Sequence, residues 1–169
     1  MKKLYVMVGI PGSGKSTWLR EHAPATAAII SRDNIRFSIV REDEDYFSHE
    51  KEVYTTFIAE IKDAIKFKDE IYVDATHLNQ ASRTKLLRSL GPSLQVVDNI
   101  EAIVISIPLK QALTNNENRT GREYVPPEQI KNMYNSFTIP TFKEGFDAVW
   151  IFNPFDKDSK CEHIVPEEI

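Results

Sequence analysis

Nine residues near the N-terminus constrain the fold more than any other part of the chain. Gly9–Thr17 read Gly-Ile-Pro-Gly-Ser-Gly-Lys-Ser-Thr, which matches the phosphate-binding loop pattern G-x-x-x-x-G-K-[ST]. The loop follows the apolar run Leu4–Val8 and precedes the helix-compatible segment Ser16–His22. A strand, a glycine-rich loop and a helix in this order direct backbone N–H groups and a helix N-terminus at a phosphate. The sequence therefore predicts an α/β fold that binds a nucleoside triphosphate.

Two side chains of this loop carry the chemistry. Lys15 is expected to reach the β- and γ-phosphates, and the Ser16 hydroxyl is expected to hold Mg²⁺. An unrelated glycine-rich turn would match the fixed positions by chance in roughly one chain in a hundred. We therefore expect ATP or another nucleoside triphosphate to bind with Mg²⁺, through further contacts from Gly9, Pro11, Gly12, Ser13, Gly14 and Thr17.

Length and composition favour a single kinase-sized domain over residues 1–169. The chain has 169 residues, 41% hydrophobic and 27% charged, which leaves no room for a second catalytic domain of ordinary size. No apolar run approaches the ~20 residues that span a bilayer, and Met1–Lys3 lead into a strand too short for a signal-peptide core. The single cysteine, Cys161, suits a reducing compartment. We expect a cytoplasmic protein that does not contact a membrane.

The charge balance limits the kind of nucleic-acid contact that is possible. The formal net charge is −4 and the pI is near 5.6, whereas proteins that neutralise many phosphates need a basic face. A local site that touches one or two phosphates remains compatible with this balance. The acidic run Glu42–Asp45 is expected to be a solvated loop.

Apolar runs alternate with helical patterns, which predicts a five-stranded parallel sheet flanked by helices. The expected strands are Lys3–Val8, Ala27–Ile30, Glu70–Val73, Ala102–Ile107 and Ala148–Phe152. No repeat, linker or domain boundary interrupts this pattern, and Thr138 to Ile169 adds the last strand and a polar tail.

Three helices are marked by apolar residues at helical spacing, which should face the core. One covers roughly Ser48–Phe67, one is capped by Asn79 and stopped at Gly91, and one begins at Pro126–Glu128 and ends near Pro140. Their expected buried residues are Tyr54, Phe57, Ile58, Ile61 and Ile65; Leu86, Leu87 and Leu90; and Ile130, Met133, Tyr134 and Phe137.

Polar residues that follow the strands are candidates for the site, because ligands of open α/β sheets bind at the carboxyl ends of the strands. Asp33 follows the second strand and is placed to accept the proton of an attacking hydroxyl. Arg36, one helical turn later, is placed to neutralise a phosphate on the acceptor. The alternative is a helix-capping Asp33 beside an exposed arginine.

A second polar cluster, Asp74–Asn79, follows the third strand. Asp74 is placed to hold Mg²⁺ through water or to orient a substrate-binding arginine, so it competes with Asp33 for the role of base. We favour Asp33, because it is paired in sequence with an anion-binding arginine. Thr76 and His77 are further candidates for contacts with the substrate.

A third cluster, Asn118–Tyr124, contains two arginines around a glycine. Arg119 and Arg122 suit a mobile lid that closes over the triphosphate and supplies positive charge as the bond breaks. The alternative is a solvated turn whose charges maintain solubility. The choice between Arg119 and Arg122 as the main lid arginine stays open from the sequence.

These elements together resemble the kinase domain of phage polynucleotide 5′-hydroxyl kinase. The resemblance rests on Gly9–Trp18, Arg32-Asp33-x-x-Arg36, Asp74–Asn79 and Asn118-Arg119 through Pro126 with Met133-Tyr134, over roughly residues 1–137. It implies an adenylate-kinase-like P-loop fold that transfers the γ-phosphate of ATP to the 5′-OH end of DNA or RNA. By the same resemblance, the catalytic residues are Lys15, Asp33 and Arg119, with Arg36 on the acceptor phosphate and Asp74 organising the acceptor site.

Two other functions are compatible with the sequence. The first is a small-molecule P-loop kinase that acts on a nucleotide, sugar or antibiotic hydroxyl, which the acidic pI favours. The second is a nucleotide-driven switch without an acceptor, which Asp33 and Arg36 disfavour. A phosphatase active site is not expected, because neither Asp43-x-Asp45 nor Asp156-x-Asp158 follows an apolar strand.

Overall fold

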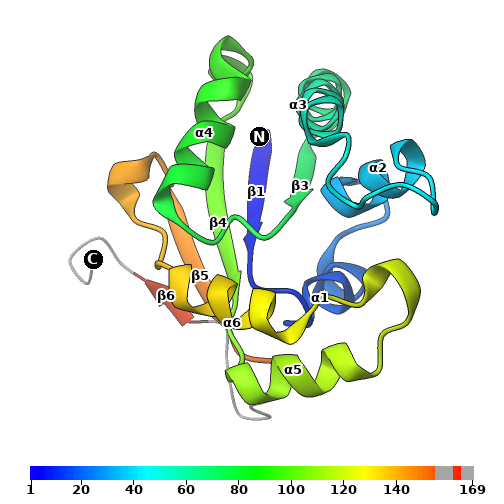
Figure 1. The fold of residues 1–169 in the computed structure, drawn as a ribbon. Helices are drawn as coiled ribbons and strands as arrows, with labels where there is room; N and C mark the ends of the chain where they lie inside the picture. The colour runs from blue at the N-terminus through cyan, green and yellow to red at the C-terminus, as the bar shows by residue number, and fades with distance from the viewer. Residues whose placement is uncertain (155–161, 165–169) are drawn as a thin grey trace.

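The computed structural model describes residues 1–154 and 162–164 and forms one twisted sheet with helices around it (Figure 1). The strand order is β2-β3-β1-β4-β5-β6. The strands are β1 (Lys3–Val8), β2 (Ala28–Ser31), β3 (Glu70–Asp74), β4 (Asn99–Ile105), β5 (Ala148–Phe152) and β6 (Glu162–Ile164). The expectations for Cys161 and Asp156-x-Asp158 concern residues outside the described ones.

The five predicted strands are confirmed, and all of them pair in parallel. The sixth strand, β6, pairs antiparallel with β5 and was not predicted. It has three residues in a polar segment, so it carries no apolar run that would mark a strand. β4 begins three residues before its predicted start because Asn99–Glu101 pair with β1 although they are not a continuous apolar run.

Six α-helices connect the described strands. They are α1 (Lys15–His22), α2 (Arg32–Ile39), α3 (Glu50–Phe67), α4 (Gln80–Leu90), α5 (Leu109–Glu117) and α6 (Pro127–Ser136). Three 3₁₀ turns complete the chain, η1 (Gly91–Val96), η2 (Gly121–Glu123) and η3 (Phe142–Glu144). Within residues 1–154 and 162–164, no helix combines the length and apolar character needed to cross a membrane.

The helices form layers on both sides of the sheet and at one end of it. Apolar residues of α3 and α4 pack with Leu4, Val6 and Val8 of β1 on one face, while Leu19 of α1 packs with Met7 on the other. Helices α5 and α6 lie at the end of the sheet where β1 leads into α1 (Figure 1). This arrangement leaves the carboxyl ends of the parallel strands facing α1, α2 and α5.

Most of the predicted helical stripes are confirmed. Phe57, Ile58, Ile61 and Ile65 are buried on α3, and Tyr54 is half-buried. Asn79 caps α4 in a reciprocal pair with Ser82, as the sequence predicted. The prediction for Tyr134 was wrong, because this residue is exposed on α6 while Ile130 fills the core. α6 also ends at Ser136, four residues before Pro140.

Strand register brings the first two polar clusters and the phosphate-binding loop to the carboxyl end of the sheet. Ser31 at the end of β2 pairs with Asp74 at the end of β3, and β3 lies next to β1, which leads into the phosphate-binding loop. The Gly9 N–H donates to the Thr76 carbonyl over 3.0 Å, so the loop after β3 is joined to the start of the phosphate-binding loop. The fold therefore sets Asp33, Asp74 and Lys15 on neighbouring strand ends.

Candidate active site

The phosphate-binding loop is shaped by its glycines. Gly12 and Gly14 have φ angles of +81° and +98°, which side chains rarely adopt. A Cβ atom at Gly12 would lie 2.8 Å from the Ala112 carbonyl oxygen, so α5 approaches the loop as closely as a glycine allows. The Asn115 side-chain amide on the same helix donates to the Gly12 carbonyl over 2.8 Å. Helix α5 therefore supports the loop from behind.

The Lys15 side chain lies along its own loop. Its ammonium group donates to the carbonyls of Gly9 at 2.8 Å and Ile10 at 3.1 Å. Burial lowers the pKa of Lys15, and the carboxylates of Asp74 and Asp33 oppose that shift. The lysine is therefore a partly buried cation whose charge interacts with two carboxylates.

The loop fits a nucleoside triphosphate with Mg²⁺. The Ser13 hydroxyl is buried and has no hydrogen-bond partner in the described part of the chain, as expected of a group that awaits a ligand. Ser16 and Thr17 are exposed in the first turn of α1. No cluster of three metal-ligating side chains occurs among residues 1–154 and 162–164. Mg²⁺ commonly binds through one or two protein oxygens and the substrate phosphates, which the Ser16 hydroxyl can satisfy.

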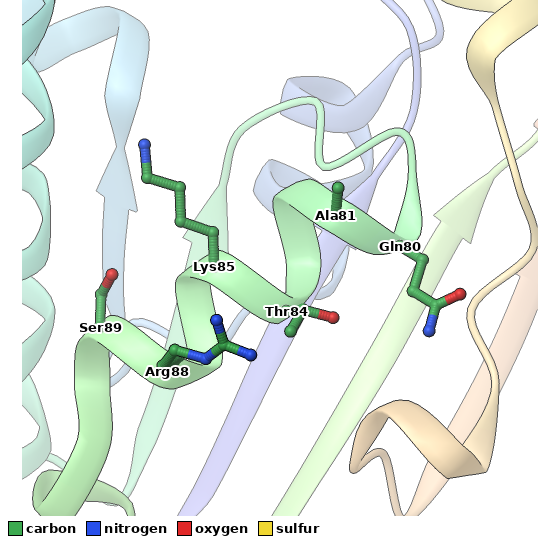
Figure 2. Close-up of a pocket in the computed structure, with 6 residues that line it drawn as sticks. All are labelled: Gln80, Ala81, Thr84, Lys85, Arg88 and Ser89. Carbon is green, nitrogen blue, oxygen red and sulfur yellow. The ribbon is translucent and has the colours of Figure 1, made fainter.

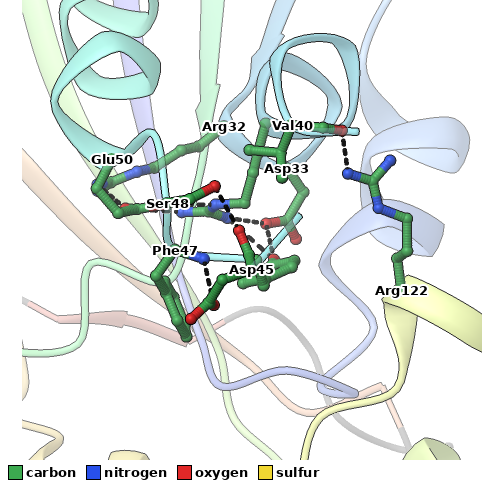
Figure 3. A network of polar contacts seen from close by, with 10 residues as sticks. Arg32, Asp33, Val40, Asp45, Phe47, Ser48, Glu50 and Arg122 are labelled. Carbon is green, nitrogen blue, oxygen red and sulfur yellow. Dashed lines mark hydrogen bonds and ion pairs between the residues drawn. The ribbon is translucent and has the colours of Figure 1, made fainter. Parts of the chain in front are cut away.

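Asp33 and Arg36 lie in one polar network (Figure 3). The Asp33 side chain is 66% exposed and accepts hydrogen bonds from Arg36 at 2.8 Å and from the Tyr46 hydroxyl at 3.1 Å. Asp33 lies in the first turn of α2, but the cap of that helix is Ser31, whose hydroxyl accepts from the Asn34 N–H. The capping alternative for Asp33 is therefore wrong, and its carboxylate stays open to an acceptor.

Arg36 is buried, and all three nitrogens of its guanidinium group have partners. Nε and Nη2 donate to the two carboxylate oxygens of Glu50 at 2.8 and 3.1 Å, and Nη1 donates to Asp33 and Tyr46. Burial tends to raise the pKa of Glu50, but the Arg36 hydrogen bonds and charge hold it below its ordinary value. Glu50 also pairs with Arg32 at 3.1 Å. To bind an acceptor phosphate, Arg36 would have to share donors that the protein already uses.

Asp74 differs from Asp33 in its surroundings. It is half-buried, and burial raises its pKa, whereas Lys15 lowers it and Asp33 raises it. Asp74 therefore interacts mainly with the phosphate-binding lysine, while Asp33 is the more accessible carboxylate. This difference favours Asp33 as the group that meets a hydroxyl and Asp74 as the group that orients Lys15.

His77 supports the loop after β3 from inside the protein. It is 6% exposed, its Nδ1 lies 2.9 Å from the Met7 carbonyl, and its ring stacks on Phe57. Burial lowers the pKa of His77 to about 4, so the imidazole is neutral and Nδ1–H donates to Met7. Arg83, also buried, donates to the His77 carbonyl and pairs with Glu144 at 2.7 Å. Because so little of the His77 surface is exposed, this side chain holds the loop after β3 in place rather than contacting a substrate.

The two lid arginines have different partners. The Arg119 charge acts on Lys15, and its guanidinium makes one long bond of 3.4 Å to the Glu123 carbonyl. Arg122 donates to the carbonyls of Phe37 and Val40 at the end of α2 (Figure 3). Its guanidinium also lies 5.0 Å from the centre of the Phe37 ring. Arg119 thus stays close enough to Lys15 for their charges to interact, whereas Arg122 is bonded to the end of α2.

Several residues of the site escaped the sequence prediction. Glu50, Tyr46, Asn115 and Arg83 carry no motif, and each reaches its partner through the tertiary fold. Asn116 is similar, since its side chain both donates to and accepts from the backbone of Val125 at the end of the lid. Only Glu50 had a local signal, because it begins the α3 apolar pattern as an acid in the first turn.

A shallow depression of about 600 Å³ lies away from this site, on the outer face of α4 (Figure 2). It is lined by Gln80, Ala81, Thr84, Lys85, Arg88 and Ser89. The Lys85 ammonium lies 4.3 Å from the centre of the Tyr54 ring, so one of its two cations already has a partner. None of the sequence-predicted site residues lines this depression.

Comparison with known proteins decides the family. The AAA_33 family model, described as an AAA domain, matches residues 4–140. The chain belongs to the AAA_33 family of P-loop kinases. The five parallel strands and the phosphate-binding loop agree with the P-loop kinase fold of this family. The family also implies binding of ATP, usually with Mg²⁺.

Individual relatives differ in what they act on. The chain is 30% identical over 152 residues to the L-seryl-tRNA(Sec) kinase of Methanococcus maripaludis, covering 85% of this chain and 56% of that protein. A putative kinase from Chloroflexus aurantiacus has a TM-score of 0.71 at 11% identity. The match covers 94% of this chain and 89% of that protein. A chain of the Pnkp1/Rnl/Hen1 RNA repair complex has a TM-score of 0.60 at 19% identity, with 80% and 43% covered. The two structural similarities show the fold alone, and the chain spans about half the length of its curated relative.

Proposed function

We propose that this AAA_33 kinase transfers the γ-phosphoryl group of ATP to the 5′-hydroxyl end of a nucleic acid. The observation that carries the proposal is the exposed carboxylate of Asp33, held by the buried Arg36 two strands away from the Lys15 loop. A nucleotide switch has no need of an accessible carboxylate beside an arginine on the acceptor side. A kinase that acts on a hydroxyl uses both.

In this proposal each side chain contributes to one step. ATP would supply the phosphoryl group, with ADP as the leaving group, and the Ser16 hydroxyl would hold the Mg²⁺ ion that accompanies it. Asp33 accepts the proton of the attacking hydroxyl, and Lys15 and Arg119 stabilise the charge that develops on the transferred group. Asp74 orients Lys15 through the attraction between their charges. Because the transition state is loose, positioning and charge contribute more than basicity.

The acceptor is held by the elements around α2. Arg36 contacts the phosphate that follows the 5′ nucleoside by sharing the donors that now meet Asp33 and Glu50. Thr76, whose carbonyl accepts a hydrogen bond from the Gly9 N–H, lies in the loop after β3 and is a further proposed contact for the acceptor. The acidic pI fits a site that binds one chain end rather than a long duplex. A reaction that uses ATP also fits the cytoplasmic location proposed from the sequence.

The names of two similar proteins support an acceptor that contains RNA. One is a kinase of seryl-tRNA, and the other belongs to an RNA repair complex. Both names concern RNA, so RNA ends are the first acceptors to test. The donor preference and the choice between DNA and RNA are addressed by the same assay.

The test is transfer of radiolabelled γ-phosphate to a 5′-hydroxyl oligonucleotide. A 5′-phosphorylated oligonucleotide of the same sequence is the control, and free nucleosides, sugars and aminoglycosides form a parallel panel. We expect label on the 5′-hydroxyl oligonucleotide and none on its 5′-phosphorylated counterpart. Label on small molecules alone would exclude the polynucleotide function.

A small-molecule kinase is the second candidate, and one observation favours it. Glu50 and Asp33 neutralise Arg36, so the acceptor side carries less positive charge than a phosphate site usually does. A neutral hydroxyl compound would need no free arginine. The acceptor panel above separates the two candidates.

A further inference from the structure

An exposed aromatic ring lies at the edge of the acceptor network. Phe47 is 51% exposed in the turn between α2 and α3, although large apolar side chains are usually buried. The turn is held by its own hydrogen bonds, since Asp45 Oδ1 accepts from the Phe47 N–H at 3.1 Å and the Ser48 hydroxyl donates to the Asp45 carbonyl at 2.6 Å. The ring is therefore presented to solvent by an ordered turn (Figure 3).

The protein supports this ring from one side. The Tyr46 ring meets it edge to face, with centroids 4.8 Å apart, and the guanidinium carbon of Arg36 lies 5.8 Å from the Phe47 centroid. The same guanidinium lies 4.6 Å from the Tyr46 centroid. An arginine and two aromatic rings thus form a cluster in which the Phe47 ring is half-exposed.

This aromatic cluster is hydrogen-bonded to Asp33, the candidate base. The Tyr46 hydroxyl donates to Asp33 Oδ1 at 3.1 Å, and Arg36 donates to the same oxygen at 2.8 Å. An acceptor whose hydroxyl meets Asp33 would therefore bring its neighbouring groups to the Phe47 side of the network. A planar group with a π-face is the partner that an exposed phenyl ring backed by an arginine binds best.

We propose that Phe47 is a stacking platform for the 5′-terminal nucleobase of the acceptor. This inference rests on the proposed polynucleotide function and adds the group that is recognised. Stacking is the suitable grip here, because Glu42, Asp43 and Asp45 in the same segment are exposed acids that repel a phosphodiester backbone. A terminal base carries no charge and stacks whatever its sequence. The platform therefore predicts a kinase that reads the end of a strand with little sequence preference.

The test pairs a protein variant with a substrate variant. One 5′-hydroxyl oligonucleotide has a normal terminal nucleotide, and the other has an abasic sugar at that position. We expect the wild-type KM to be about 10-fold higher for the abasic acceptor. Phe47→Ala should raise the KM about 10-fold for the normal acceptor and leave the KM for the abasic one unchanged. Phe47→Tyr should restore the normal value.

Phe67→Ala is the matched control, because Phe67 is an 81% exposed phenylalanine at the far end of α3. It should leave both KM values unchanged. Equal KM increases for both acceptors in Phe47→Ala would overturn the platform, since the ring would then only hold the turn. Equal wild-type KM values for both acceptors would also overturn the platform and leave the polynucleotide function standing. Failure to label either oligonucleotide, with label on a small molecule, would exclude both.

Discussion

The proposed donor half and the proposed acceptor half of this site are built in different ways. The donor half is a loop of backbone amides, fixed by two left-handed glycines and backed by α5. The acceptor half is a network of side chains in which Arg36, Glu50 and Asp33 neutralise one another. A loop made of backbone can serve any triphosphate, whereas a network of side chains can be changed one residue at a time. We therefore expect related kinases to differ mainly in the residues of the acceptor half.

Removing the donor lysine should have the largest effect. Lys15→Ala deletes the partly buried cation that meets the phosphates, and we expect kcat to fall about 10³-fold with a further loss in kcat/KM for ATP. Steady-state kinetics measure both values. Lys131→Ala on α6 is the control, because that lysine is exposed and its ion pair is with the neighbouring Glu128. A loss below about 10-fold in Lys15→Ala would contradict the donor assignment.

We assign Arg119 to the donor half and Arg122 to the acceptor half, so variants of these two arginines compare the halves directly. Arg119→Ala should lower kcat about 10³-fold, because its charge acts at the donor side. Arg122→Ala should lower kcat less than about 10-fold, because its partners are the carbonyls of α2. Single-turnover rates at saturating ATP separate the two variants. A reversed order would assign the donor contact to Arg122.

The two carboxylates give the next comparison. Asp33→Asn should lower kcat about 10²-fold by removing the proton acceptor. Asp43→Asn is the control, because Asp43 is an exposed acid of the neighbouring loop whose ion pair is with Arg41. If Asp74→Asn lowered kcat more than Asp33→Asn while leaving the KM for ATP unchanged, the base role would pass to Asp74.

Arg36 tests whether the acceptor half binds a phosphate. Arg36→Ala should raise the KM for a 5′-hydroxyl oligonucleotide about 10-fold and change the KM for ATP little. Thermal unfolding of the same variant reports the cost of leaving Glu50 without its partner. An unchanged KM for the oligonucleotide would remove Arg36 from the acceptor site.

The smallest expected effect concerns His77, the buried histidine in the loop after β3. The pKa of His77 is lowered from 6.5 to about 4, so the unfolded chain binds a proton more readily than the folded one. The contribution of His77 to the free energy of unfolding is therefore fully present above pH 6.5 and is lost as the pH falls toward 4. At pH 5.5 we expect a loss of about 1 kcal/mol relative to pH 8, which His77→Asn should abolish. Urea unfolding at the two pH values measures it, and an equal loss in the variant would assign the slope to other groups.

The sequence predicted the donor half well because its information is local. Nine consecutive residues directly after β1 contain the glycines and the lysine, so the whole motif can be read from one short segment. The parallel strands were predicted for the same reason, from short apolar runs. The three-residue β6 had no such run.

The acceptor half was predicted only in part because its contacts are set by the tertiary fold. Asp33 and Arg36 are one helical turn apart and could be paired from the sequence. Glu50 lies 14 residues from Arg36, and nothing in the sequence shows that it holds the guanidinium. His77 was predicted to contact substrate, but its burial against Met7 and Phe57 appears only in the folded chain. Burial and pairing of charges are the properties that a linear motif does not contain.

The most direct test of the two-sided site is a crystal structure with a non-hydrolysable ATP analogue, Mg²⁺ and a 5′-hydroxyl trinucleotide. We predict that the 5′ oxygen lies about 3 Å from a carboxylate oxygen of Asp33 and in line with the γ-phosphate that Lys15 contacts. A trinucleotide bound with its 5′ oxygen away from Asp33, or bound outside the edge formed by β1, β2 and β3, would contradict it.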